Sequence, residues 1–408
     1  MKVLLKVAVL VCLCARLATA QNVDELKPGT SRVDDPRHPP ASSPDEAGPL
    51  SKWIGYKDKY GFNIIPWGYI RLSYETVANP KDYDYIGRYD GFVLNNARTG
   101  VDFSLGKQFS GRVSVEAATD VNDELNTPFG TVDVRLKDGY ARWDPFDFIG
   151  AQGGQFKAPF NAEELRSTAD LMFIDRAVGL EGVLVARGFQ QPGLEVDRQL
   201  GVMLSPREAF ALPADFGLSY FFMVGNGNGE NQILNDNSKV AIYGRVEGYY
   251  ADWVTLGAAG QWNKRTVGDP PNRFDENDAG WDVDLLINPG NFEFYFDFIQ
   301  IQTDYPDVDV SDRTQEEFHV QAGYRFRAPW FFITPAYRYA WFNPWADGPN
   351  KIAGVDNQDY LLQYHTLGLR VGDLDLPISL YLNYTFTVER SPRELENNRF
   401  QVLAQVEF

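Results

Sequence analysis

The sequence predicts an all-β fold: a 16-stranded antiparallel transmembrane β-barrel with a constriction loop after its fifth strand. Three observations predict it. Apolar and polar residues alternate in short runs, the connections between these runs alternate between long and short, and the last run is a two-faced strand that ends on Phe408. In such a barrel the apolar face contacts lipid, and the polar face contacts a water-filled lumen.

Two runs show the alternation most clearly. In 291–302 every second residue from Phe292 to Phe298 is Phe, and the residues between them are Glu293, Tyr295 and Asp297. A strand places these four rings on one face, whereas a helix would scatter them around its axis. In 398–408 the apolar face holds Phe400, Val402, Ala404, Val406 and Phe408, and only Leu403 breaks the pattern. An edge strand of a soluble sandwich is the alternative for this last run.

Sixteen such runs are expected to be strands. A barrel of this size leaves a water-filled channel, whereas eight strands enclose a lumen that side chains fill. The expected strands are 61–75, 91–105, 109–119, 131–143, 147–158, 194–204, 215–225, 239–250, 253–263, 280–288, 291–302, 316–327, 330–342, 359–371, 376–389 and 398–408.

The connections between these strands give an independent argument. Long connections alternate with short turns, as in an up-and-down barrel with long outer loops and short periplasmic turns. A soluble sandwich has no reason to show this alternation. The long connections are 76–90, 120–130, 159–193, 226–238, 264–279, 303–315, 343–358 and 390–397.

The N-terminus divides into two further segments. Residues 1–20 are expected to be a secretory signal peptide, because Lys2 and Lys6 precede a short apolar run and Ala18-Thr19-Ala20 is a cleavage signal. Residues 21–50, rich in Pro, Ser, Asp and Glu, are expected to be a disordered periplasmic tail or linker, and residues 51–408 the outer-membrane barrel. An N-terminal anchor is the alternative for the first segment.

Charge and cysteine content exclude several classes of function. Both cysteines, Cys12 and Cys14, lie in the expected signal peptide, so the remaining chain has no disulfide and no thiolate metal site. The signal peptide carries three of the 38 basic residues and none of the 56 acidic ones, so its removal changes the net charge from −18 to −21. Nucleic-acid binding is not expected, because it requires a basic surface.

The longest connection, 159–193, is the candidate constriction. Asn161 has the character of a helix N-cap, and a short helix is expected to continue as far as Met172. A charged loop that folds into a lumen narrows it and acts on ions in a confined space. The candidate constriction residues are Glu163, Glu164, Arg166, Asp170, Asp175 and Arg176; an ordinary surface loop is the alternative.

Several motifs resemble the phosphate-selective porin O/P family. The most specific is the run Gly154-Gln155-Phe156-Lys157-Ala158-Pro159-Phe160, and the others are 134–140, 161–164, Asp175-Arg176, 186–188 and 225–231. The resemblance covers most of residues 55–408. It implies a sixteen-stranded outer-membrane channel, usually a homotrimer, whose third loop folds into the pore. The glycines Gly150, Gly153 and Gly154 in strand 147–158 suit a subunit interface.

The resemblance also implies a pore lined by basic side chains. The candidates are Arg98, Arg112, Arg135, Lys137, Lys157, Arg245, Arg325 and Arg338. They are interleaved with acidic residues on the same strands, namely Asp102, Glu116, Asp133, Glu247, Glu293, Asp297 and Glu317. The sequence therefore leaves two alternatives open: a channel for anions such as phosphate, or a general or cation-preferring porin.

We expect a passive diffusion channel for small hydrophilic solutes, with no cofactor, no metal site and no catalytic residue. The acidic segments 269–278 and 304–312 are expected to be solvated loops rather than cation sites. An outer-membrane enzyme would need a nucleophile beside His319 or His365, and an adhesin would have a plugged lumen. Expected partners are outer-membrane lipids, lipopolysaccharide, and the barrel-assembly machinery through the last strand with Phe408.

Overall fold

The fold was obtained as a computed structural model of the 408-residue chain. The structure describes residues 55–408 apart from 81–82, 84, 88–89, 121–130, 252, 269, 309–310, 347–359, 375 and 390–393. The expected signal peptide, 1–20, and the expected tail, 21–50, lie outside the described residues. Most residues of the long connections 120–130 and 343–358 also lie outside them. Among the described residues, no helix has both the length and the hydropathy needed to cross a membrane.

The structure is a closed antiparallel barrel of 16 long strands, as the sequence predicts. Three shorter strands pair with the ends of barrel strands: β1 (Tyr56–Lys57) with β2, β10 (Phe210–Leu212) with β11, and β17 (Phe326–Arg327) with β18. The barrel strands are β2 (Phe62–Val77), β3 (Gly91–Leu105), β4 (Phe109–Asp120), β5 (Thr131–Phe146), β6 (Ile149–Lys157), β9 (Arg198–Ser205), β11 (Phe216–Gly225), β12 (Ala241–Tyr250), β13 (Val254–Val267), β14 (Phe274–Ile287), β15 (Phe292–Asp304), β16 (Arg313–Tyr324), β18 (Phe331–Asn343), β19 (Leu362–Asp373), β20 (Ile378–Glu389) and β21 (Arg399–Glu407).

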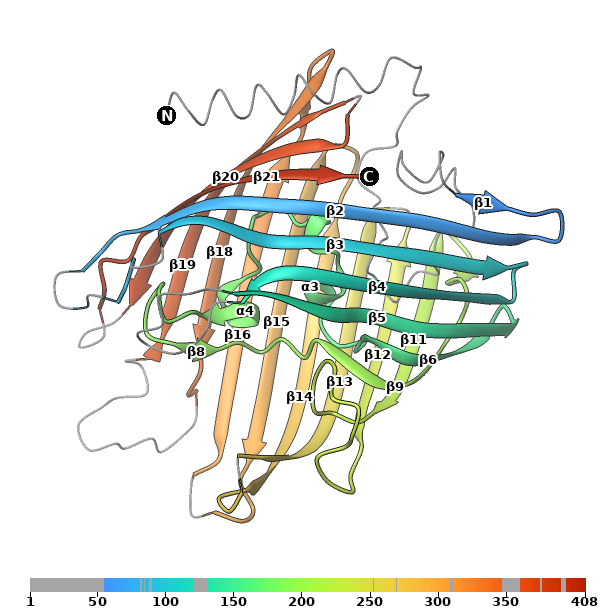
Figure 1. Cartoon of the computed structure of the whole chain (residues 1–408), viewed down its shortest axis with the longest axis horizontal. Helices are drawn as coiled ribbons and strands as arrows, with labels where there is room; N and C mark the ends of the chain where they lie inside the picture. Colours follow the sequence, from blue (N-terminus) through green and yellow to red (C-terminus); the bar gives the residue numbers. More distant parts are fainter. Residues whose placement is uncertain are drawn as a thin grey trace.

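The barrel closes where its first long strand pairs with its last. β2 and β21 are antiparallel from Tyr69 opposite Glu407 to Val77 opposite Arg399. Beyond β21, the backbone of Phe408 exchanges two hydrogen bonds with Gly68. A side chain on Gly68 would meet the Phe408 ring at 2.4 Å, so glycine leaves the space that this ring occupies. Figure 1 shows β2 and β21 side by side at the seam.

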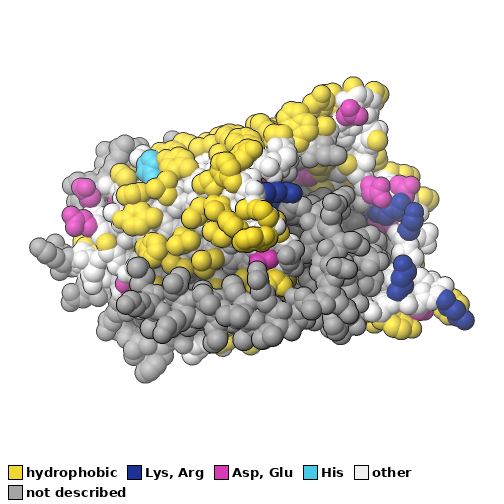
Figure 2. Space-filling view, turned by 90° about the horizontal axis from the view of Figure 1, so that it is seen from above, with side chains coloured by type: hydrophobic (Ala, Val, Ile, Leu, Met, Phe, Trp, Pro, Cys, Tyr) yellow, Lys and Arg dark blue, Asp and Glu magenta, His cyan; other side chains and the backbone are white. Residues whose placement is uncertain are grey.

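The strands present apolar side chains outward and polar side chains inward. On β12, Ile242 and Val246 are exposed, whereas Arg245 and Glu247 are buried inside the barrel. On β15, Asp297 is buried on the inner face. Figure 2 shows hydrophobic side chains over the middle of one face of the molecule, with most of the charged side chains near its two ends.

Large aromatic side chains gather on the outer surface beside the short turns. Phe109 stacks on Trp143 across the β4–β5 ladder, and Phe216 contacts Tyr250 across the β11–β12 ladder. Trp330 is 65% exposed beside the short turn that precedes β18. Such a girdle is typical of barrel strands at a membrane–water interface, where one end of the ring is in an apolar layer.

Three expected boundaries are wrong. β13 and β14 extend through most of 264–279, so Asp275, Glu276 and Asp278 of the acidic segment lie on a strand and not in a loop. The expected strand 316–327 breaks at Arg325, after which β17 pairs separately. The turn 205–214 contains β10, which extends the β11 edge. In β13, β14 and β10 the ladder hydrogen bonds continue beyond the expected strand ends, whereas at Arg325 the ladder is interrupted.

The expectation that the glycines of the fifth strand form an outer surface for a subunit contact is also partly wrong. Gly150 does not face outward, because a side chain there would meet the inward carboxylate of Asp144 at 2.0 Å. Gly153 has open space around it and is exposed. Only part of the run therefore offers a small outer surface for a subunit contact.

The outward face of β12 tests the lipid assignment. We expect Val246→Arg to lower the free energy of unfolding in lipid bilayers by about 2–4 kcal/mol, because it places a charge on the mid-strand lipid face. Val246→Leu should change that free energy by less than about 0.5 kcal/mol. Urea titration of bilayer-inserted protein, followed by tryptophan fluorescence, measures both. Equal stability of the two variants would contradict the lipid assignment.

Candidate functional site: the constriction loop

The connection between β6 and β9 lies inside the barrel, and we call residues 158–197 the constriction loop. Its first half is almost wholly buried, including Phe160, Leu165 and Phe173. It contains α3 (Ala162–Leu165), a 3₁₀ turn at Thr168–Asp170, α4 (Val178–Glu181), β7 (Gly182–Val183) and β8 (Gln191–Pro192). Figure 1 shows α3 and α4 enclosed between the β2–β6 wall and the β13–β18 wall.

The helix at the start of the loop is shorter than expected. Asn161 caps it, because its side chain accepts a hydrogen bond from the Glu164 N–H. The helix stops after Leu165 rather than continuing to Met172, since Arg166 is extended and Ser167 starts a new turn. Lys157 Nζ donates to the Arg166 carbonyl at 2.9 Å, so a cation satisfies the free end of the helix.

Arg245 attaches the beginning of the loop to the wall. Its side chain is completely buried, and Nη1 donates to the Phe160 carbonyl at 2.9 Å. Its charge is balanced by Glu247, Asp282 and Asp284, at 2.7, 3.2 and 2.7 Å. Because these carboxylates take up its charge, Arg245 serves as an anchor for the loop and not as an open lumenal cation.

The six candidate constriction residues all lie in the lumen, but each is already engaged. Glu163 lies 3.5 Å from His319 Nε2 and 3.7 Å from Arg338 Nη1. Arg166 pairs with Glu293 at 2.8 Å, and Arg176 donates to carbonyls inside the loop. Asp170 accepts from Arg166 through its backbone carbonyl, 3.3 Å away.

Asp175 joins the loop to the barrel seam. It accepts from Gln401 at 2.8 Å and lies 3.1 Å from Arg399 and 3.4 Å from Arg187. Burial raises the pKa of the Asp175 carboxyl, but Arg187 and Arg399 outweigh burial and hold this pKa at about 2. Asp175 is therefore charged at neutral pH and holds the loop at the seam.

Most of the expected pore-lining cations are paired with carboxylates. Arg98 pairs with Asp138, and Arg112 pairs with Asp102 at 2.6 Å. Arg135 pairs with Asp133 at 2.5 Å, and Lys137 pairs with Glu230 at 2.8 Å. Lys157 contacts loop carbonyls, Arg338 donates to the Asp175 carbonyl at 2.9 Å, and Arg325 lies over the Phe332 ring at 4.7 Å. These residues therefore do not form a continuous row of basic side chains open to the pore.

Three further arginines lie inside the barrel that the sequence analysis does not name among the pore-lining candidates, although Arg187 belongs to the family motif 186–188. Arg187 makes two hydrogen bonds to Glu75, at 2.9 and 2.7 Å. Arg399 begins β21, and Arg142 pairs with Asp144 inside the barrel. Arg399 lies on the polar face of an alternating strand and could be found that way. Arg187 lies in a loop without periodicity, so only the folded chain reveals its place.

Four arginines, two from the loop and two from the wall, surround one small cavity between them. The cavity has a volume of about 10 Å³, room for a water molecule. Loop and wall contribute to it together, and Glu181 is the acidic residue among its neighbours. We call it the arginine gap, and its charged lining is Arg176, Arg187, Arg338, Arg399 and Glu181.

Comparisons with known proteins identify the fold. No family model matches the chain, and no curated protein matches it. The outer-membrane channel DcaP of Acinetobacter baumannii matches 87% of this chain and 99% of its own, with 15% identity and a TM-score of 0.56. An anion-selective porin from Comamonas acidovorans matches 85% and 100%, with 14% identity and a TM-score of 0.53. OmpF of Salmonella typhi matches 87% and 100%, with 10% identity and a TM-score of 0.54. The chain has the fold of outer-membrane porins.

Glu164 makes docking of the loop sensitive to pH. Its carboxylate is buried and accepts from the Val196 N–H at 3.1 Å. Burial, with Glu195 and Asp197 nearby, raises the pKa of Glu164 from its ordinary 4.5 to about 8. The side chain of Glu181 is 33% exposed, and its partial desolvation within the barrel, together with the nearby Asp175, raises its pKa to about 7. An undocked loop releases these protons at lower pH, so docking weakens as pH rises from about 4.5 to 8.

We therefore expect the conductance of the protein in planar bilayers to increase by more than about twofold between pH 5 and pH 8.5. Glu164→Gln should reduce this increase, because the amide does not ionise. Glu208→Gln, at a side chain that is 78% exposed, is the matched control and should leave the increase unchanged. A conductance that is independent of pH, or equal in all three proteins, would show that Glu164 does not control the loop.

Proposed function

We propose that the protein is a passive diffusion channel of the outer membrane, through which small hydrophilic solutes pass with anions preferred. The porin fold, the apolar outer surface and the aromatic girdle support a membrane channel. The loop inside the barrel supports a narrow constriction. The arginine gap supports the preference for anions.

The arginine gap is the observation that carries the proposal. Its lining holds four guanidinium groups and one carboxylate, and Glu75, Asp175 and Glu163 pair with three of these arginines from outside the lining. In a confined space between low-dielectric walls, the arginines that face the cavity are weakly screened and act on a passing ion. Arginine also binds carboxylates and phosphates with two parallel hydrogen bonds. Phosphate, which the family resemblance suggests, is therefore the first solute to examine.

A cation-preferring or general channel is the second candidate. The chain has a net charge of −18, and several carboxylates lie on the inner faces of β14, β15 and β16. These inner carboxylates are Asp282, Asp284, Asp297 and Glu317. Asp282 and Asp284 lie beside Arg245, and none of the four carboxylates lines the arginine gap. We therefore give the gap the larger effect on a passing ion.

We also propose that the channel carries out no chemical reaction. His319 contacts Glu317 and Glu163, and His365 Nδ1 lies 2.7 Å from the Tyr337 hydroxyl. The two histidines belong to separate strands, β16 and β19. In the described part of the chain, neither has the serine partner that a hydrolase of the triad type requires.

A homotrimer embedded in lipid and lipopolysaccharide is the assembly that we propose. The exposed Gly153 on β6 offers a flat outer surface to a second copy. The last strand, which ends beside Phe408, is the segment that we propose the barrel-assembly machinery recognises. Chemical cross-linking in native membranes, read out as a ladder of three bands, examines the trimer.

The reversal potential under a KCl gradient tests the anion preference. We expect a chloride-side potential for the refolded protein in planar bilayers, and a current that phosphate reduces. Arg187→Gln and Arg399→Gln should each lower the chloride-to-potassium permeability ratio by roughly twofold or more, because each removes a charge from the gap. Arg135→Gln, at an exposed arginine outside the gap, is the matched control.

Two outcomes would contradict the proposal. A potassium-side potential that phosphate does not change would mean that the acidic residues control the pore. Equal shifts in the Arg135, Arg187 and Arg399 variants would mean that the gap has no special role. A folded barrel without any current would favour an adhesin or another plugged structure.

A further inference from the structure

A group of buried carboxylates lies between the constriction loop and the barrel wall. Arg245 balances Glu247, Asp282 and Asp284 on β12 and β14, and Arg338 lies 3.7 Å from Glu163. Asp297 and Glu317, on β15 and β16, form no ion pair with an arginine among the described residues. Buried charges are expensive unless a charge of opposite sign is near, so this part of the lumen favours a cation.

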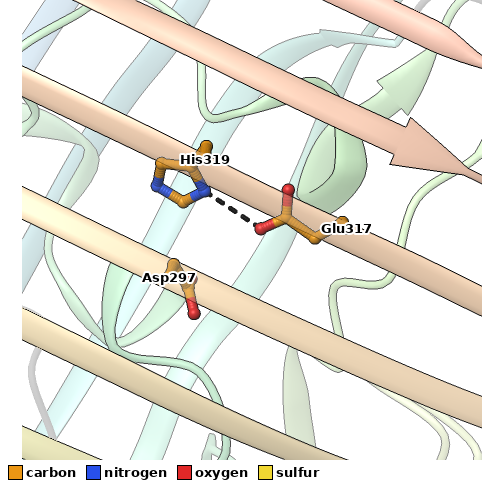
Figure 3. A group of neighbouring side chains, drawn as sticks. All are labelled: Asp297, Glu317 and His319. Carbon is orange, nitrogen blue, oxygen red and sulfur yellow. Dashed lines mark hydrogen bonds and ion pairs between the residues drawn. The ribbon is translucent and has the colours of Figure 1, made fainter.

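Asp297, Glu317 and His319 form the centre of this group. Asp297 lies directly opposite His319 in the ladder between β15 and β16, and Ile299 lies opposite Glu317. One potential metal-ligating atom from each side chain lies within 4.8 Å of the other two. All three residues have 0% exposure. Figure 3 shows them on the two neighbouring strands, with Glu317 and His319 joined by a hydrogen bond.

Each of the three side chains retains a polar atom without a hydrogen bond. These atoms are Asp297 Oδ1, Glu317 Oε2 and His319 Nε2, and all are shielded from solvent. Buried polar atoms in folded proteins almost always have partners, so the two carboxylate oxygens, Asp297 Oδ1 and Glu317 Oε2, indicate that a group belongs beside them. His319 Nε2 lies within ion-pair distance of Glu163 Oε2, at 3.5 Å.

The two nitrogens of His319 have different neighbours. Nδ1 lies 3.0 Å from Glu317 Oε1, toward the carboxylate cluster on the wall. Nε2 faces Glu163, which belongs to the constriction loop. A metal-binding histidine commonly gives one nitrogen to the metal and the other to a carboxylate, which fixes the orientation of the ring. Glu163 is placed to be that carboxylate.

We propose that Asp297, Glu317 and His319 bind one divalent transition-metal ion, with Glu163 of the loop positioning the histidine. A set of one imidazole and two carboxylates suits Zn²⁺ and its first-row neighbours. It suits Ca²⁺ and Mg²⁺ less well, because these ions take oxygen ligands. Ligands around a tetrahedral Zn²⁺ lie roughly 3.4 Å apart, so atoms now within 4.8 Å need only small side-chain rotations.

The proposed ion would connect the loop to the wall through His319 and Glu163. The wall supplies all three ligands from two adjacent strands, which hold them rigidly. The loop supplies only Glu163, whose other carboxylate oxygen is 3.7 Å from Arg338. Binding of the metal would therefore strengthen docking of the loop without requiring the loop to be in place first.

Equilibrium dialysis against Zn²⁺, with metal content measured by mass spectrometry, tests the site. The full-length barrel is refolded, treated with EDTA and dialysed, and heat-modifiable gel mobility confirms its fold. The sequence has three histidines, so the double variant His38→Gln/His365→Gln leaves His319 as the sole histidine. We expect this variant and the wild type to bind one Zn²⁺ per chain with equal affinity.

His319→Gln and Asp297→Asn should each weaken binding by roughly tenfold or more, and Glu163→Gln by several-fold. Asp297→Asn preserves side-chain volume and removes one buried charge, so it keeps the test decisive if His319→Gln does not fold. Stoichiometric binding that survives both substitutions would overturn the proposal. Absence of Zn²⁺ binding by the folded wild type would overturn it equally.

Discussion

The position of the constriction loop depends on the buried guanidinium of Arg245. It donates to the carbonyl of Phe160, which lies two residues before α3 begins, and contacts Glu247, Asp282 and Asp284 on the wall. Removing one partner of a buried ion pair costs about 3–5 kcal/mol, since the remaining charge loses its compensation. Arg245 therefore holds the beginning of the loop against the wall, and Asp175 holds its middle at the seam.

The lumen contains many charges, yet most of them neutralise each other. Asp138 is shared by Arg98 and Arg198, and Asp102 is bound by Arg112. Paired charges of this kind shape and stiffen a wall but give little net field to a passing ion. The arginine gap is lined by four arginines and by Glu181, and the carboxylates that pair with Arg187, Arg338 and Arg399 lie outside its lining. The proposed selectivity is therefore local rather than a property of the whole wall.

The fold could be predicted from the sequence because alternation and connection length are local signals. The site could be predicted only in part. Leu403 breaks the apolar pattern of β21 because it packs inside the barrel on Ile174 of the loop, a contact between distant segments. The pairing of Arg245 with Asp282 and the cluster around His319 likewise depend on which strands become neighbours. Periodicity places each side chain on a face, but it does not identify the partner across that face.

Cross-linking of the loop to the seam tests the central claim most directly. Outside residues 1–20 the chain has no cysteine, so Ile174→Cys/Leu403→Cys introduces a single pair. Ile174→Cys/Ala404→Cys is its matched control, because Ala404 points outward from β21. A short bifunctional thiol reagent should join the first pair in the folded barrel and leave the second unjoined. Equal cross-linking of both pairs, or of neither, would contradict a loop held inside the barrel.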